Sequence, residues 1–307
     1  MINDKGYAII KKDKENDTLS HAYMLLCKDD NPEEYLKNYA KLILCANNGC
    51  NNCRTCRLID KNTLPDLKAV FKSSILVDDV NRLVEDTSVK PMEQDKKLYL
   101  ISDFSMANQN SQNKLLKVLE EPPKGVHFLL ACTNEYKVLD TIKSRVKLLE
   151  NPPIDENELY NQLIGEFSDS NALKSAIEIS GGYYYKTINA ISQATTLKTF
   201  VLDLLKGYKK SSQLAVYSKK INKDNIAGVI SLLKVFFSQM LAYTQGDKTV
   251  DKELQVLASE YKVGAILEIE NMLDMAEKKL FFNANISMLA DLVLFSLLEV
   301  KYKWQKL

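Results

Sequence analysis

Residues 97–123, KLYLISDFSMANQNSQNKLLKVLEEPP, decide the fold. The first six residues form a short apolar run, which is typical of a buried strand. The segment that follows, 106–121, has helical spacing of its apolar residues. Pro122 and Pro123 end that helix because a residue before proline avoids the helical region. A buried strand followed by a helix is the unit from which covered parallel sheets are built, so we expect an α/β domain.

The same alternation extends on both sides of this stretch. Further strands are expected at 22–26, 66–71, 126–133 and 145–150, with helices at 32–44 and 77–89. After Asn151-Pro152-Pro153 no strand pattern remains. Three short helices are expected at 154–167, 170–180 and 183–194, with Gly181-Gly182 ending the second, and longer helical segments follow at 225–245 and 264–304. We therefore expect an α/β domain over 1–152, a small helical domain over 153–205 and a larger helical domain over 206–307.

Composition limits the possible partners. The chain has 307 residues, of which 26% are charged, and a formal net charge of +1, so no global field attracts it to nucleic acid or to anionic lipid. The first 17 residues lack the apolar core of a signal peptide, and the longest apolar runs are too short or too interrupted by charge for a membrane span. We expect a cytoplasmic protein without a membrane partner.

Four of the six cysteines crowd into residues 45–56, CANNGCNNCRTC; they are Cys45, Cys50, Cys53 and Cys56. Four thiolates satisfy tetrahedral Zn²⁺ and leave no open position, so the spacing favours a structural zinc site. Cys45 has the loosest spacing, so its place among the ligands stays open. A redox pair or unrelated free thiols are the alternatives. Cys27 and Cys132, in apolar strand-like segments, are expected to be buried small hydrophobes.

The turn after the first strand, CKDDNPEEY at 27–35, lies where a nucleotide-binding protein would hold phosphate. A phosphate loop needs glycines and a lysine at the helix start. Here no glycine occurs between Gly6 and Gly49, and Lys28 lies at the strand end. We expect no ATP at this position.

The same turn has the residues of a self-sufficient helix start. Asn31 is a good N-cap and Pro32 suits the first helical position. Glu33 and Glu34 lie in the first turn, where carboxylates stabilise the helix dipole, and Glu34 has the spacing of a capping box with Asn31.

The end of the strand in residues 97–102 also indicates that no nucleotide binds here. A phosphate-loop ATPase places an acid after its central strand to hold Mg²⁺. Here Ser102 follows the strand, and Asp103 comes one residue late, which turns it to the other face. We expect Asp103 to be a cap or turn residue rather than a metal ligand.

These segments together resemble a known family. SHAYMLL at 20–26, the four cysteines, residues 97–123 and FLLACTNEYKVLDTIKSRVKLLENPP at 128–153 resemble bacterial clamp-loader subunits of the AAA+ class, above all the delta-prime family. The resemblance covers about the first 205 residues; beyond them the chain is similar only in being helical. It implies an AAA+ parallel-sheet domain with an inserted zinc module, a helical lid and an all-α collar that assembles a ring.

The resemblance also implies a role for Ser144-Arg145. They match the family's Ser-Arg-Cys motif, with Val146 in place of the cysteine. In that motif the arginine acts in trans as a finger on ATP bound by the neighbouring subunit, where a permanently charged guanidinium stabilises the transferred phosphoryl group. The alternative is a solvated arginine before an edge strand. Thr133-Asn134, where active relatives sense the γ-phosphate, is expected to be a strand cap or turn.

The function implied is that of a structural subunit of the replicative DNA polymerase III clamp loader that does not hydrolyse ATP. Its partners would be the gamma/tau ATPase subunits and the delta subunit in a hetero-oligomeric ring, and indirectly the sliding clamp and primed DNA. Zn²⁺ would be its structural cofactor. Two alternatives remain open: an active ATPase subunit of the gamma/tau type, and a stand-alone zinc-dependent nucleic-acid-binding protein.

Overall fold

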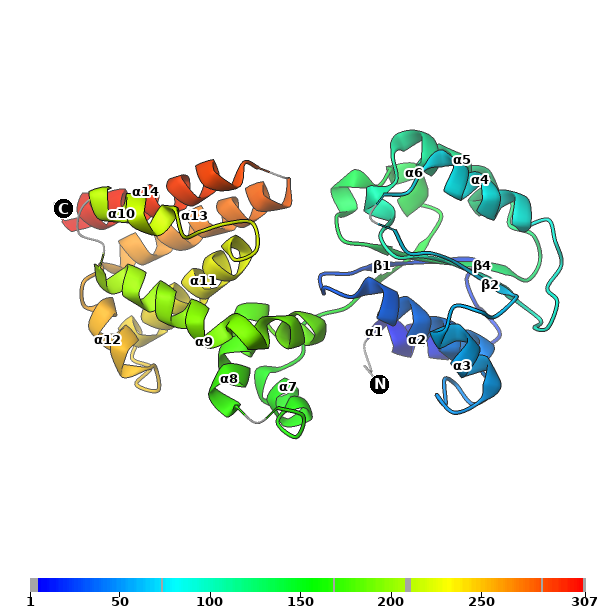
Figure 1. Cartoon of the computed structure of the whole chain (residues 1–307), viewed down its shortest axis with the longest axis horizontal. Coiled ribbons are helices and arrows are strands. Elements are labelled where there is room, and N and C mark those ends of the chain that lie inside the picture. Colours follow the sequence, from blue (N-terminus) through cyan, green and yellow to red (C-terminus); the bar gives the residue numbers. More distant parts are fainter. Residues whose placement is uncertain (1–4, 73, 168, 208–210, 283, 306–307) are drawn as a thin grey trace. The chain divides into compact units, whose positions relative to one another are not determined.

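A computed structural model describes residues 5–72, 74–167, 169–207, 211–282 and 284–305 (Figure 1). The chain forms two compact units, residues 1–152 and 153–307. Each unit has its own hydrophobic core.

The first unit is built on one parallel sheet of five strands, in the order β2-β3-β4-β1-β5. Its strands are β1 (Ala22–Leu26), β2 (Leu67–Val70), β3 (Lys97–Ile101), β4 (Val126–Cys132) and β5 (Lys147–Glu150). In the centre, β1 pairs with β4 and β5, in registers that join Ala22 to Phe128 and Tyr23 to Lys147. The strands predicted from apolar runs are therefore present, including the edge strand β5.

Helices cover both faces of this sheet (Figure 1). On one face lie α1 (Lys5–Glu15), α2 (Pro32–Leu44) and α3 (Arg54–Asp60). On the other lie α4 (Val77–Asp86), α5 (Gln109–Glu120) and α6 (Asp140–Lys143), and two short 3₁₀ turns, η1 (Phe104–Met106) and η2 (Glu135–Lys137), follow β3 and β4. Strands β3 and β4 are buried along their whole length, as expected of central strands covered on both sides. The predicted α/β class is confirmed.

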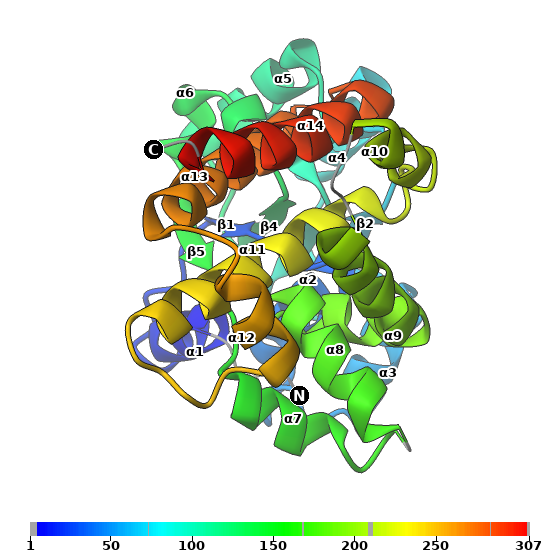
Figure 2. The ribbon, with the colours of Figure 1, turned by 90° about the vertical axis from the view of Figure 1, so that its left-hand side faces the viewer.

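The second unit is entirely helical over its described residues. It contains α7 (Glu156–Leu163), α8 (Ser170–Ser180), α9 (Tyr184–Gly207), α10 (Ser211–Ser218), α11 (Ile226–Thr244), α12 (Lys252–Ala258), α13 (Val263–Phe281) and α14 (Ile286–Gln305). A small apolar cluster joins α7 and α8 and includes Leu159, Leu163 and Leu173. A larger one runs from the second half of α9 to α14, with α13 beside α14 (Figure 2).

Helix α11 is the only described helix whose length and mean hydropathy, 1.6, would allow it to cross a membrane. Its apolar residues, including Leu232, Phe236 and Phe237, are buried in the larger cluster of the second unit. Helix α11 is therefore a core helix of the helical unit, and such helices can be as long and as apolar as a membrane span.

Two details of the helical unit differ from what its sequence pattern predicts. The segment predicted as a short helix at 183–194 is the first half of α9, which continues to Gly207. The segment at 264–304 is two helices, since Phe282 ends α13 and the Asn285 side chain accepts from the N–H of Met288 at the start of α14. The left-handed Gly181 ends α8, as predicted.

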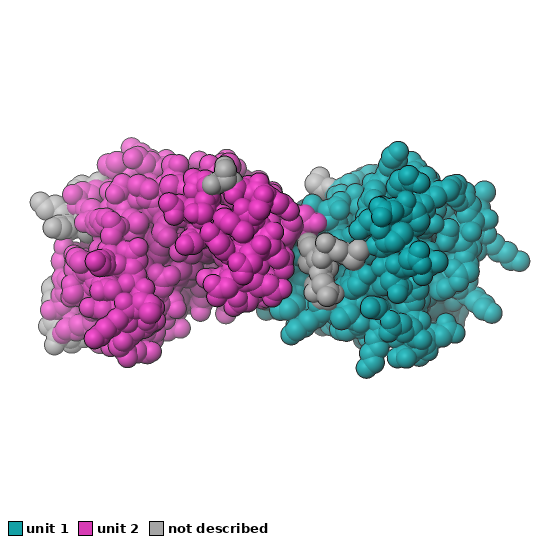
Figure 3. Space-filling view, turned by 90° about the horizontal axis from the view of Figure 1, so that it is seen from below, with its two compact units in different colours: residues 1–152 teal, residues 153–307 magenta. Residues whose placement is uncertain are grey.

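The division of the chain into two units falls between Pro152 and Pro153 (Figure 3). The further boundary expected at about residue 205 lies close to the end of α9. A separate lid over 153–205 and a separate collar over 206–307 stay predictions.

Candidate functional site

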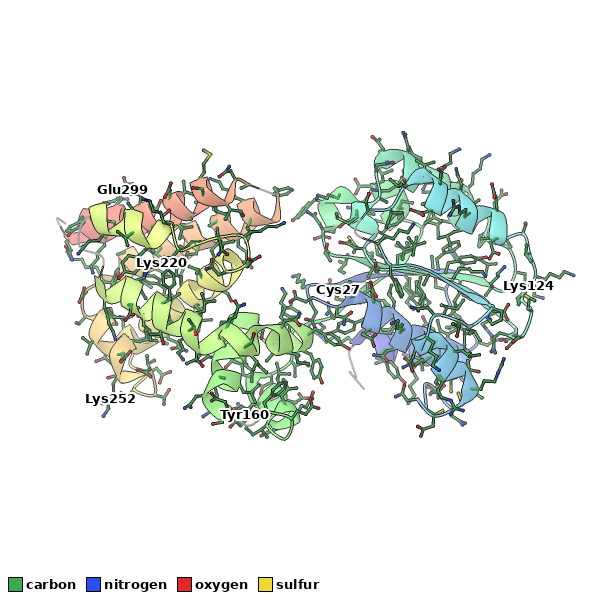
Figure 4. The ribbon with its side chains drawn as sticks, viewed as in Figure 1. Cys27, Lys124, Tyr160, Lys220, Lys252 and Glu299 are labelled. Carbon is green, nitrogen blue, oxygen red and sulfur yellow. The ribbon has the colours of Figure 1, made fainter. Side chains whose placement is uncertain are left out.

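The turn after β1, where a phosphate would lie, is filled by the protein's own side chains. Asp29 is buried; its Oδ2 accepts a hydrogen bond of 2.8 Å from the Tyr35 hydroxyl, and its Oδ1 accepts one from the N–H of Asp30. Asn151, from the end of β5, accepts from the N–H of Lys28 at 3.2 Å. Figure 4 labels Cys27, the residue at which this turn leaves the sheet. A carboxylate thus lies inside the turn, where it would repel a phosphate.

The start of α2 is capped as predicted. The Asn31 side chain accepts from the N–H of Glu34 at 3.4 Å, and Pro32 is the first helical residue. The Glu34 carboxylate pairs with Lys37 at 3.1 Å, so it does not return to the cap as in a complete capping box. One of the amides that would bind an anion is used by Asn31, and proline has no N–H at the first position.

Asp103, after β3, is held by hydrogen bonds from two strand ends. Its Oδ1 accepts from the N–H and hydroxyl of Ser105 and from the N–H of Thr133, and its Oδ2 accepts from the Thr133 hydroxyl at 2.7 Å. It caps η1, which confirms the predicted cap role. Asn134 likewise caps η2 and is buried. The pair Asp103–Thr133 ties β3 to β4 at the edge where a metal-bound nucleotide would lie.

The structure places Arg145 directly after α6, before β5, about one third exposed. Its guanidinium contacts Glu120 Oε1 at 2.7 Å and donates to the carbonyl of Thr141 at 2.8 Å and to Ser144 Oγ at 3.2 Å. Glu120 is the last residue of α5. The two motif residues Ser144 and Arg145 are thus in contact, and the guanidinium is held at the surface by an acid and a carbonyl.

The four clustered cysteines are brought together. Their Sγ atoms all lie within 4.8 Å of one another, and Cys45 Sγ is 3.7 Å from the Sγ atoms of both Cys50 and Cys53. A tetrahedral Zn²⁺ with bonds of about 2.3 Å would place its sulfur ligands about 3.8 Å apart. The donor set therefore fits a four-coordinate thiophilic metal ion, and the Cys45 sulfur lies within reach of the other three.

The surroundings of these sulfurs shift their pKa values in opposite directions. Burial raises the pKa of Cys45, but the backbone N–H groups of Cys50, Asn47 and Gly49 outweigh burial and lower it to about 6. Burial raises the pKa of Cys56 to about 12. Cys53 is the N-cap of α3, and its sulfur accepts from the N–H of Cys56. Cys27 and Cys132 lie apart from this cluster and are buried at adjacent strand ends, as predicted.

Several polar side chains that organise this unit carry no signal in the sequence. Asp66 is fully buried and accepts from three consecutive backbone N–H groups, those of Met92, Glu93 and Gln94, at 2.6–2.7 Å. Gln112 on α5 donates to two carbonyls and accepts from the N–H of Leu139 just before α6. Asp66 and Gln112 each form at least one hydrogen bond with a residue more than 20 positions away in the sequence, so no local pattern reveals these contacts.

An ion pair, also unforeseen, connects the cysteine segment to the loop before β3. Arg54 donates to both carboxylate oxygens of Glu93, at 2.6 and 3.2 Å. Because Asp66 fixes the same loop, α3 and the cysteine segment are attached to the sheet from this side as well.

Comparisons with known proteins give one family. The sequence model of the family described as "DNA polymerase III, delta subunit" matches residues 2–155. The chain is 33% identical over 156 residues to DNA polymerase III subunit delta' of Bacillus subtilis, which covers 49% of this chain and 47% of that protein. It is 34% identical over 123 residues to DNA polymerase III subunit tau/gamma of Haemophilus influenzae, covering 40% of this chain and 18% of that protein.

The chain thus matches about half the length of the first of these relatives and less of the second. Among solved structures, a gamma subunit-related protein of Thermotoga maritima aligns with 97% of this chain and 100% of its own, at 16% identity and a TM-score of 0.47.

Proposed function

Because the chain belongs to the DNA polymerase III delta subunit family, we propose that it is a clamp-loader subunit of the delta-prime type that hydrolyses no ATP itself. In this proposal it supplies Arg145 to ATP bound by a neighbouring gamma/tau subunit. The delta subunit is a further ring partner, and the assembly acts on the sliding clamp and primed DNA in the cytoplasm.

The observation that carries the proposal is the occupation of the nucleotide edge by internal hydrogen bonds. Asp29 fills the turn after β1, and both carboxylate oxygens of Asp103 accept hydrogen bonds from Ser105 and Thr133. The N–H groups of Lys28, Asp30 and Glu34 donate to protein side chains in this turn, and both Asp103 oxygens accept from protein groups, so these groups are engaged where phosphate and Mg²⁺ would need them. Isothermal titration of the purified chain with ATP and Mg²⁺ tests this: we expect no binding, and a micromolar dissociation constant would contradict the proposal.

Arg145 is suited to act on a neighbour's nucleotide because it is about one third exposed and its guanidinium keeps donors beyond those used by Thr141, Ser144 and Glu120. An arginine finger is worth about 10³–10⁵ in rate at the site that receives it. Arg145→Ala should therefore leave assembly intact and silence the one ATP site that it reaches in the reconstituted complex. Lys143→Ala, two residues earlier, is the matched control, and an ATPase rate equal to that of wild type in both variants would remove Arg145 from this role.

Assembly through the helical unit is supported by an exposed apolar stripe on α14. Met288, Leu292 and Phe295 are 72%, 40% and 42% exposed, and their spacing places them on one face of the helix. Exposed apolar residues gathered on one face mark interaction surfaces. Figure 4 labels Glu299, one turn further along the same helix.

The metal in this proposal is structural Zn²⁺, held by the four clustered cysteines. When bound it would crosslink the end of α2 to the start of α3 and supply no open coordination position. Metal analysis should give one zinc ion per chain, and Cys53→Ser should release it. A metal-free, fully folded protein would reject the assignment.

An active ATPase subunit of the gamma/tau type is the second candidate, because relatives with those names are 25–36% identical to this chain over their matched regions. It requires ATP to displace the Asp29–Tyr35 hydrogen bond. The same titration with ATP distinguishes the two candidates.

A further inference from the structure

The segment that carries the cysteines contains two left-handed asparagines on either side of Cys50. Asn48 has φ 51° and Asn51 has φ 60°. This backbone is costly for residues other than glycine, although asparagine tolerates it best. The two turns set where the sulfurs of Cys45, Cys50 and Cys53 lie, so whatever holds them also holds the metal site.

Each of these asparagines is held by a lysine from outside the segment. Lys14 Nζ, on α1, donates to Asn48 Oδ1 at 3.1 Å. Lys41 Nζ, on α2, donates to Asn51 Oδ1 at 3.0 Å. The Tyr7 hydroxyl adds a bond of 2.8 Å to the carbonyl of Asn48. Two helices thus fix the turns before and after Cys50.

Lys14 makes the larger contribution. Besides Asn48, it donates to the carbonyls of Leu42 and Cys45 at 2.8 and 2.9 Å, so its ammonium satisfies three acceptors at once. Leu42 and Cys45 lie at the C-terminal end of α2, where a positive charge is favourable. One side chain therefore joins α1, the end of α2, the backbone of a ligand cysteine and the first left-handed turn.

The charge of Lys14 also complements the site. Four thiolates around a divalent cation carry a net charge of −2, which a nearby cation stabilises. Lys41 shares its charge with Asp60, 2.5 Å away. The Lys14 ammonium interacts electrostatically with Cys45, and, unlike Lys41, it forms none of the ion pairs found between described residues.

We propose that Lys14 is a positioning residue of the metal site, which orders the Cys45–Cys50 turn and offsets the charge of the bound thiolates. This rests on the metal site proposed above. Residues that orient metal ligands in this way are commonly worth 10- to 100-fold in metal affinity.

The test is a titration of the reduced full-length chain with Co²⁺, followed by the thiolate-to-cobalt absorption that only a sulfur-bound metal gives. Lys14→Met should weaken Co²⁺ binding about 10- to 100-fold. Lys12→Met, an exposed lysine on the same helix, is the control and should bind like wild type. Asn48→Gly keeps the left-handed turn at no steric cost and removes only the side-chain acceptor, so it should weaken binding severalfold and covers the case in which Lys14→Met does not fold.

The possible outcomes distinguish the metal site from the role of Lys14. If wild type gives no tetrathiolate cobalt spectrum, the metal site itself is refuted. If wild type binds Co²⁺ and Lys14→Met or Asn48→Gly binds equally well, the role of Lys14 is overturned. A variant that lowers unfolding stability but leaves the dissociation constant unchanged also overturns that role, because a residue that only stabilises the fold does not alter the affinity of the folded site.

Discussion

Replacing Gly264 by alanine tests how closely α14 lies on α13. A Cβ atom at position 264 would contact Cη2 of the Trp304 ring and lie 2.5 and 2.7 Å from Cζ3 and Cζ2. Carbon atoms pack at about 3.5–4.0 Å, so the ring must withdraw by about 1 Å. Trp304 Nε1 donates to Glu268 Oε2 at 2.7 Å, and this bond is lost when the ring moves.

Two effects of Gly264→Ala on the free energy of unfolding oppose each other. Forcing an added carbon atom into an occupied contact costs about 1–3 kcal/mol, whereas alanine in place of glycine gains at most about 1 kcal/mol of helix propensity. Because the overlap is severe, we expect a steric cost of about 2–3 kcal/mol, so Gly264→Ala should lower the free energy of unfolding of the helical unit by about 1–2 kcal/mol after the propensity gain.

Trp304 is the only tryptophan of the chain, so its fluorescence reports this contact directly. Gly264→Ala should shift the emission to longer wavelength and increase quenching by acrylamide, and denaturant unfolding gives the free energy. Gly165→Ala, where no atom lies within 4 Å of the added Cβ, is the control in the same unit. Unchanged emission together with a stability gain of about 1 kcal/mol, the propensity effect alone, would refute the close contact.

Two predictions concern hydrogen-bonded carboxylates of the α/β unit, the buried Asp66 and the partly exposed Asp86. Asp66→Asn replaces one acceptor oxygen by a donor that faces backbone N–H groups, so denaturant unfolding should show a loss of about 2–4 kcal/mol; a loss below about 0.5 kcal/mol would show that water substitutes for the carboxylate. For Asp86, burial raises the pKa, but the hydrogen bonds from Lys97 and Tyr99 outweigh burial and hold it below its usual range. Its contribution to stability is therefore complete above about pH 4, the unfolded pKa, and is lost as the pH falls through the lower folded pKa. Acid unfolding of Asp86→Asn should depend less steeply on pH below 4 than that of wild type, and equal slopes would contradict the assignment.

The residues whose roles could be predicted are those with partners close in sequence. Asn31 and Asp103 were assigned as caps because the amides that they accept from are two or three residues away. Central strands such as β3 and β4 were found because burial on both faces leaves a continuous apolar run.

Long-range polar contacts could not be predicted from the sequence. The sequence pattern predicts no helix over residues 5–15, because its lysines obscure the buried face of α1. The contacts of Lys14 follow no local pattern either, since their acceptors lie 28–34 positions away. The break between α13 and α14 was missed for a related reason: apolar residues continue through it, and Asn285 acts as a cap only once α14 has formed.

The order of the strands has a consequence for synthesis of the chain. β1 is made first, yet it lies inside the sheet between β4 and β5, and both of these partners come about 100 or more residues later. At about 5–20 residues per second, the nascent β1 waits roughly 5–20 s before either neighbour has been translated. During that interval the backbone N–H and C=O groups on both sides of β1 are unpaired and can pair with strands of other chains. The residues that join α1 to the end of α2 are translated much sooner, so we expect these two helices to cover one face of β1 on the ribosome until β4 and β5 arrive.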